Sequence, residues 1–126
     1  MTQEDKELLL KDLCARLPYG VKVCARYNTG NRYTTEITAM SFDKDYIQIR
    51  QNDLHPYTGS SIEDIRPYLC PMSSMTEDES EEFFGITITH NRGEDVDWLN
   101  AHHFDYRGLI EKGLAIEVTE ENNPYV

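Results

Sequence analysis

Residues 98–108, WLNAHHFDYRG, gather the side chains of this sequence that are best suited to chemistry. Imidazole nitrogens and carboxylates are zinc ligands, and one helix face could present His102 and Asp105 together, with His90 or His103 as a further ligand. A zinc site needs three or four ligands in tetrahedral geometry, and this spacing matches no known signature such as His-Glu-x-x-His. We therefore assign no metal and no cofactor. We expect one of the adjacent histidines to bond the backbone and the other to be exposed.

The same stretch could support acid–base catalysis instead. The candidate is His103 with Asp105 or Tyr106, since a catalytic histidine needs an orienting carboxylate and a pKa near neutrality. Residues two apart do not share a helix face, however, and Asp105 is better placed as the N-cap of a short helix ending at Gly113. A small histidine- or metal-dependent hydrolase stays an open alternative. We assign no catalytic residue and favour a protein that is not an enzyme.

The remaining side chains of this stretch are of the kind that anchors cores and interfaces. Trp98 and Tyr106 either pack the core of the second half of the chain or form a binding hot spot. Arg107 is one of three cations after residue 70, and we expect it to pair with a carboxylate of residues 94–97 or 77–82. The candidate binding residues are Trp98, His102, His103, Asp105, Tyr106 and Arg107.

The cysteine count and the hydropathy pattern point to the cytoplasm. Cys14, Cys24 and Cys70 are odd in number and include no Cys-x-x-Cys pair, which is typical of reduced thiols. Cys14 lies on an apolar helix stripe and is expected in the core, and Cys24 and Cys70 lack evident activating partners in the sequence, so we expect no thiolate nucleophile. The N-terminus is acidic, unlike a secretory signal, and no run of eighteen apolar residues could span a membrane.

The net charge of −11 is unevenly distributed. Residues 71–126 contain three Lys or Arg residues and thirteen Asp or Glu residues. Such a surface repels phosphates, so we expect no direct binding of nucleic acid. The acidic segment around Glu77, Glu79, Glu81 and Glu82 has two interpretations: a solvated helix face, or an acidic inhibitor or nucleic-acid mimic that binds a basic host protein.

The elements that would position these residues begin with a helix. Thr2 with Asp5 forms a capping box, and Pro18 ends the helix. The apolar stripe that the spacing predicts consists of Leu10, Leu13, Cys14 and Leu17.

An antiparallel meander should follow this helix. Residues 19–27 alternate with a period of two, and residues 33–42 and 46–50 supply two further strands. We interpret residues 53–60 as a loop and residues 60–69 as a short helical turn that a proline breaks.

The second half of the chain is less regular. Thr76 with Glu79 forms another capping box, which opens an acidic helix that ends near Gly85. After it we expect a strand at 86–90, a helix at 96–103, a final strand at 114–118 and a frayed polar tail at 119–126. These elements predict one α+β domain over residues 1–126: an N-terminal helix, a small antiparallel sheet or Src-homology-3-like barrel, then short helices with one or two added strands. Its sub-regions are 1–70, the helix and β-meander, and 71–126, the acidic part.

Three stretches carry a family resemblance: LLLKDLCARLPYGVKV, IEDIRPYLCPMSSMTEDE and WLNAHHFDYRGLIEKGLAIEV. In combination they resemble a set of small proteins of Bacteroides-group gut bacteria and their phages and mobile elements. The resemblance implies a leading helix, a variable β-rich middle and a C-terminal block, and it implies no activity. From the residues we expect a non-enzymatic cytoplasmic protein that binds an unknown protein partner. The resemblance implies that it is an accessory factor of a phage or mobile element. Its oligomeric state stays open.

Overall fold

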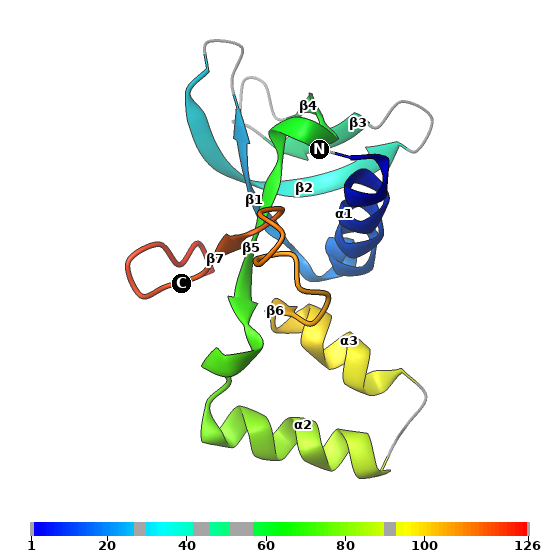
Figure 1. Cartoon of the computed structure of the whole chain (residues 1–126), viewed down its shortest axis with the longest axis vertical. Helices are drawn as coiled ribbons and strands as arrows, with labels where there is room; N and C mark the ends of the chain where they lie inside the picture. The colour runs from blue at the N-terminus through cyan, green and yellow to red at the C-terminus, as the bar shows by residue number, and fades with distance from the viewer. Residues whose placement is uncertain (1, 27–29, 42–45, 51–56, 90–92, 126) are drawn as a thin grey trace.

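The computed structural model describes residues 2–26, 30–41, 46–50, 57–89 and 93–125. It has the α+β architecture that the sequence predicts (Figure 1). One helix lies beside a sheet, and two further helices project from one end of that sheet. The segment at 43–45 between the second and third expected strands and the candidate ligand His90 lie outside the described residues, as does part of the loop expected at 53–60. No helix within the described ranges is long and apolar enough to cross a membrane.

The first helix, α1 (Gln3–Arg16), begins at the expected capping box. Thr2 Oγ1 accepts a hydrogen bond from Asp5 N at 3.1 Å, and the Asp5 carboxylate accepts from Thr2 N at 3.3 Å. The buried face, however, is displaced by one residue from the predicted stripe and consists of Leu9, Asp12, Leu13 and Arg16. The prediction was wrong because two charged side chains pair with each other inside the core. A short 3-10 turn, Leu17–Tyr19, follows α1.

The sheet is mixed. Its strands are β1 (Lys22–Arg26), β2 (Arg32–Ser41), β3 (Tyr46–Arg50), β4 (Tyr57–Ser61), β5 (Arg66–Pro71), β6 (Phe104–Asp105) and β7 (Ile116–Glu117). The expected antiparallel meander β1–β2–β3 is confirmed. Residues 57–60, which we expected in a loop, instead belong to β4, which pairs with β3. Strand β5 pairs antiparallel with β1 and parallel with both β6 and β7. The described pairings run β4-β3-β2-β1-β5-β6, which is an open path and not a closed barrel.

The main core lies between α1, β1 and β5. The predicted inward face is confirmed at Val21, Val23 and Ala25, which are all buried. The alternation itself is incomplete, since Cys24 is buried as well and Tyr19 is exposed in the 3-10 turn. A 3-10 turn, Ile62–Asp64, lies between β4 and β5, and its Ile62 is buried in the same core. From the far end of the sequence, Leu109 and Leu114 complete the cluster. The first and last thirds of the chain therefore share one core.

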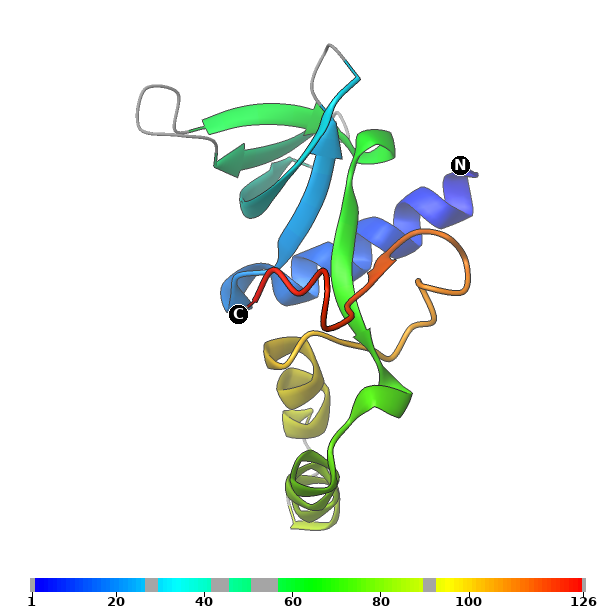
Figure 2. The same cartoon turned by 90° about the vertical axis from the view of Figure 1, so that its left-hand side faces the viewer.

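The two remaining helices form the projecting end of the molecule (Figure 2). After a short 3-10 turn, Met72–Ser74, the chain enters α2 (Glu77–Thr89), and α3 (Glu94–Ala101) returns toward the sheet. The capping box of α2 is confirmed, since Thr76 Oγ1 accepts from Glu79 N and Glu79 Oε1 accepts from Thr76 N.

The expected strand at 86–90 was wrong for residues 86–89, which continue α2. The hydroxyls of Thr87 and Thr89 donate to the carbonyls of Phe83 and Gly85, four residues earlier, so these β-branched residues bond within the helix. Ile86 packs beside the cluster formed with α3.

The C-terminal segment also differs from expectation. Residues 109–113 form turns, not the short helix that we expected after Asp105. The final strand is reduced to the two residues of β7. The tail is not frayed at Tyr125, whose hydroxyl donates to Tyr68 O at 2.7 Å and accepts from Lys22 N at 3.1 Å. This hydroxyl joins β1 and β5 from the end of the described chain.

Candidate functional site

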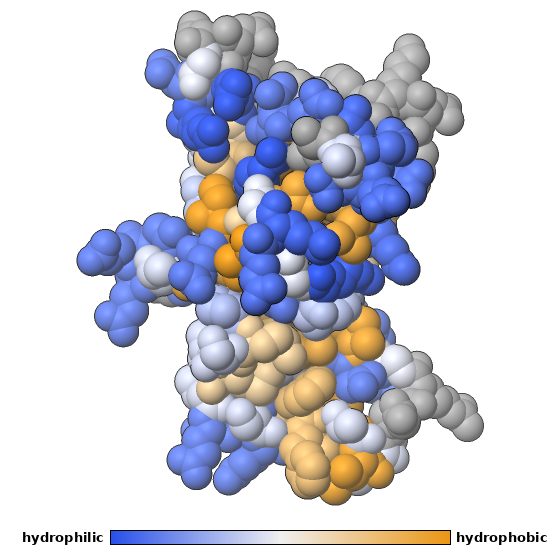
Figure 3. Space-filling model, viewed as in Figure 1, coloured by the Kyte–Doolittle hydropathy of each residue, from blue (hydrophilic) through white to orange (hydrophobic). Residues whose placement is uncertain are grey.

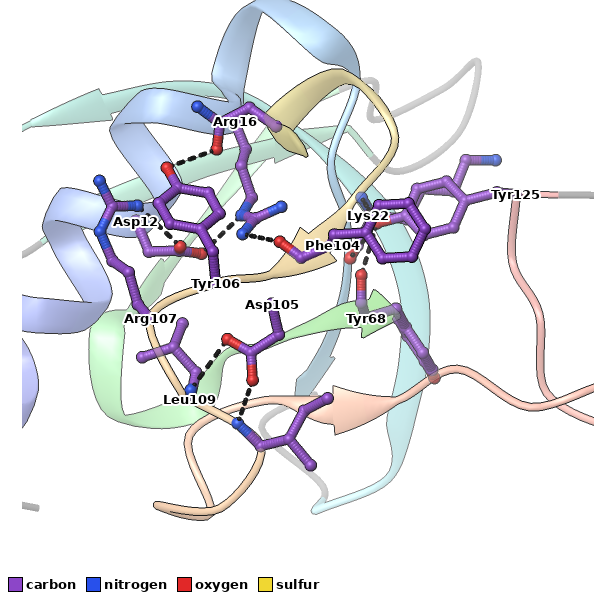
Figure 4. Close-up of polar contacts among 12 residues, drawn as sticks. Asp12, Arg16, Lys22, Tyr68, Phe104, Asp105, Tyr106, Arg107, Leu109 and Tyr125 are labelled. Atoms are coloured by element: carbon purple, nitrogen blue, oxygen red, sulfur yellow. Dashed lines mark hydrogen bonds and ion pairs between the residues drawn. The ribbon is translucent and has the colours of Figure 1, made fainter. Parts of the chain in front are cut away.

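Arg107 belongs to a buried ion-pair cluster with α1. Asp12 Oδ2 accepts from Arg16 Nε at 2.8 Å, and Asp12 Oδ1 accepts from Arg107 Nη1 at 2.9 Å (Figure 4). The side chains of Asp12 and Arg16 are 0% exposed, and that of Arg107 is 17% exposed. Our expectation that Arg107 pairs with residues 94–97 or 77–82 was therefore wrong. Its partner is a core carboxylate that offsets two cations in a low-dielectric setting.

Tyr106 lies against both cations of this cluster. The guanidinium carbon of Arg107 is 4.6 Å from the centre of the Tyr106 ring, and that of Arg16 is 5.3 Å from it, both within cation–π range. The Tyr106 hydroxyl donates to Asn100 Oδ1 at 2.8 Å. Arg16 also donates to Phe104 O, so the whole cluster ties α1 to the segment that follows α3.

Trp98 and His102 form one stack on α3. Their ring centres are 4.0 Å apart, and His102 Nδ1 is 2.9 Å from Trp98 O. Phe83 from α2 and Phe104 from β6 add two further ring contacts to the buried indole, at 5.5 and 5.8 Å. Trp98 is therefore a core anchor that holds α2 and α3 together.

His103 faces a different part of the molecule. Its ring stacks on Tyr125 at 3.7 Å, and its backbone has a φ of 62°, which non-glycine residues seldom adopt. Burial, helped by the nearby charges of Arg16 and His102, lowers the pKa of His103 to about 4. The imidazole is neutral at pH 7. The same burial raises the pKa of the Tyr125 hydroxyl.

The carboxylate of Asp105 caps the turns that follow it. Its two oxygens accept from Leu109 N and Ile110 N, each at 2.9 Å (Figure 4). The capping role matches our expectation, although a turn stands where we expected a helix. Both oxygens bond backbone amides, so neither orients His102 or His103.

The candidate residues thus divide among four structural contacts: the ion-pair cluster, the Trp98–His102 stack, the His103–Tyr125 stack and the Asp105 cap. Within the described part of the chain, no three His, Cys, Asp or Glu side chains are placed to hold one metal ion. Burial raises the pKa of the Cys14 and Cys70 thiols, so both stay protonated at neutral pH and are poor nucleophiles. Among the described candidate residues, no histidine is hydrogen-bonded to a carboxylate in the arrangement that acid–base catalysis needs.

Asp105 and Tyr106 also line an open hollow of about 540 Å³ beside the end of β5. Glu111 and Glu117 stand at the same hollow. Since the Asp105 carboxylate already caps a turn, the polar side chains that the hollow offers a ligand are these two surface carboxylates, the Ser73 hydroxyl and Tyr106.

A surface that the sequence did not indicate lies on the outward side of α2. Phe84 and Ile88 are each 65% exposed, the largest values among the exposed apolar side chains of the described residues. Figure 3 shows apolar side chains gathered over the lower helices toward the C-terminal end of α2, and hydrophilic side chains at the N-terminal end of α2. Interpreting residues 86–90 as a strand concealed this face, because it placed Phe84 at the end of a helix and Ile88 in a separate element, whereas one continuous helix brings both side chains to one side.

Asp12, Arg16 and Tyr125 were also missed. An acid and a base four residues apart are typical of an exposed helical ion pair, so the sequence gives little reason to bury Asp12 and Arg16. One signal does exist, since Leu9 and Leu13 flank the pair at helical spacing. The polar tail offered no comparable signal for Tyr125.

Comparison with known proteins returns no match to a family model, to a curated protein or to a solved structure.

Proposed function

We propose that this chain is a non-enzymatic protein-binding module whose docking face is the outward side of α2. The observation that carries the proposal is the exposure of Phe84 and Ile88, one helical turn apart and each 65% exposed. Large apolar side chains gathered on a surface are typical of interaction sites. The inward side of the same helix is already used, since Phe83 and Ile86 pack beside the Trp98 cluster.

The geometry of the candidate catalytic residues supports the same proposal. His103, Asp105 and Tyr106, the acid–base candidates, bond or stack within the fold. The free thiols of the three cysteines support action in the reducing cytoplasm. The acidic character of α2 supports a protein partner and disfavours direct contact with nucleic acid.

Site-specific photo-crosslinking in the native cell tests this function. A benzoylphenylalanine in place of Phe84 should give one defined adduct, whose partner mass spectrometry identifies. The matched control places the same group at Lys11, which is exposed on α1. We expect no adduct there, and we expect Ile88→Ser to reduce the adduct at position 84. Equal adducts at both positions, or none at position 84, would overturn the proposal.

A further inference from the structure

We infer that the partner presents a cationic amphipathic helix to α2, an inference that rests on the proposed function and specifies its ligand. The outward stripe of α2 consists of Glu77, Glu81, Phe84 and Ile88. At about 100° per residue, these four positions fall within roughly 60° of the helix circumference. All four side chains are exposed. The stripe is acidic at its N-terminal half and apolar at its C-terminal half.

The length of this stripe matches a helix of about three turns. From Glu77 to Ile88 the axial rise is about 16 Å, at about 1.5 Å per residue. Apolar side chains of a partner helix would cover Phe84 and Ile88, and its Lys or Arg side chains would meet Glu77 and Glu81. Amphipathic helices recognised in this way carry their anchors at i, i+3 or i+4, and i+7.

Charge complementarity decides the sign of the charge on the partner helix. Residues 71 to 101 carry one cation, Arg92, and eight acids, of which α3 contributes Glu94, Asp95 and Asp97. A cationic helix is attracted to this end of the molecule, and an acidic helix is repelled.

The same charges disfavour a second copy of this chain as the occupant. In an antiparallel pair of α2 helices, Glu77 and Glu81 of one copy would lie on Phe84 and Ile88 of the other, which buries carboxylates against apolar groups. In a parallel pair, carboxylates would face carboxylates. An anionic membrane surface is disfavoured for the same reason, because it repels acidic residues.

The affinities of a series of designed peptides test the inference directly. The probe is an acetylated, amidated 18-residue helix with two Leu at i and i+4 and two Lys at i+7 and i+11 on the same face. One control replaces both Lys with Glu, and another moves both Lys to the opposite face. Fluorescence anisotropy with the full chain gives each Kd at about 0.05 and 0.3 M salt, because screening shortens the reach of ion pairs.

We expect the Lys probe to bind about tenfold more tightly than either control, and its affinity to fall at the higher salt. The matched variant Glu77→Lys/Glu81→Lys should reverse the preference toward the Glu probe, and Phe84→Ser/Ile88→Ser should abolish binding of both. Equal binding of the Lys and Glu probes, an unchanged preference in the charge-reversed variant, or no binding of any probe would overturn the inference.

Two further outcomes separate this inference from the proposed function. If the crosslink at position 84 persists while the Lys probe fails, the partner has another chemistry and the docking face stands. If the Lys probe binds equally well after Phe84→Ser/Ile88→Ser, acids alone bind it, which overturns both proposals and favours the acidic inhibitor. A dimer of the chain that Phe84→Ser/Ile88→Ser disperses in sedimentation would overturn the inference in favour of self-association.

Discussion

Asp12→Asn is the substitution that tests the buried ion-pair cluster most sharply. The amide has nearly the shape of the carboxylate, so the change removes charge and leaves packing almost intact. Asp12 accepts charge-assisted hydrogen bonds from both Arg16 and Arg107. In the variant, the fully buried Arg16 guanidinium keeps its positive charge and loses its counter-charge.

The expected loss in the free energy of unfolding is about 3–5 kcal/mol, the range for breaking one side of a buried pair. The hydrogen bonds lead to a similar figure. Two charged bonds of about 1.5–3 kcal/mol each give way to a neutral bond of about 1 kcal/mol. With a urea slope of about 2 kcal/mol per molar, the unfolding midpoint should fall by roughly 2 M.

Urea unfolding checks this value through the fluorescence of Trp98, the single tryptophan of the chain. Far-UV circular dichroism followed in parallel tests whether the two clusters unfold together. The matched control is Arg107→Gln, which keeps the Asp12–Arg16 pair and should lose only about 1–2 kcal/mol, because Arg107 is partly exposed.

A double substitution that removes both charges of the buried pair gives a second test. Replacing the pair by apolar residues, as Asp12→Leu/Arg16→Met, should leave the chain more stable than Asp12→Asn alone, because no fully buried charge is left behind and the unpaired Arg107 is partly exposed to water. A loss below about 1 kcal/mol in Asp12→Asn, or one no larger than in Arg107→Gln, would refute the assigned role of burial.

Three further substitutions test separate features. His103 has a pKa of about 4 in the fold and 6.5 as its ordinary value, so its contribution to the free energy of unfolding is complete above about pH 6.5 and is lost as pH falls toward 4. The difference in this free energy between the parent and His103→Asn should therefore shrink as pH falls from 6.5 to 4. A difference that does not change with pH would contradict this. Tyr125→Phe should lower the free energy of unfolding by about 1–3 kcal/mol, since it removes the hydroxyl bonds to Tyr68 O and Lys22 N; an unchanged urea midpoint would count against this. Gly85→Ala should stabilise α2 by up to about 1 kcal/mol, because an added methyl group meets open space; a lower melting temperature would disprove it.

Local rules predicted the parts of this fold that depend on neighbours in sequence. Both capping boxes, at Thr2 and Thr76, form as expected, because each needs only two residues three apart. The burial of Val23 and Ala25 in β1 agrees with the period of two, although Cys24 between them is also buried. Asp105 caps its turn for the same local reason.

Tertiary context decided the rest. The residues of ITIT at 86–89 have the alternation of a strand, but Ile86 reaches the Trp98 cluster only in a helix, and packing overrode propensity. Asp12 is buried because Arg107 and Arg16 both reach it, and Arg107 lies 95 residues away. No window of neighbouring residues contains that contact.

The bond from Arg16 to Phe104 joins residues 88 positions apart. During synthesis at about 5–20 residues per second, α1 therefore waits roughly 4–18 s for the residues that complete its burial. Over that interval the charges of Asp12 and Arg16 remain hydrated and oppose premature collapse of the apolar residues beside them. Arg16 therefore gains its backbone partner at Phe104 only after the segment that follows α3 has been synthesised.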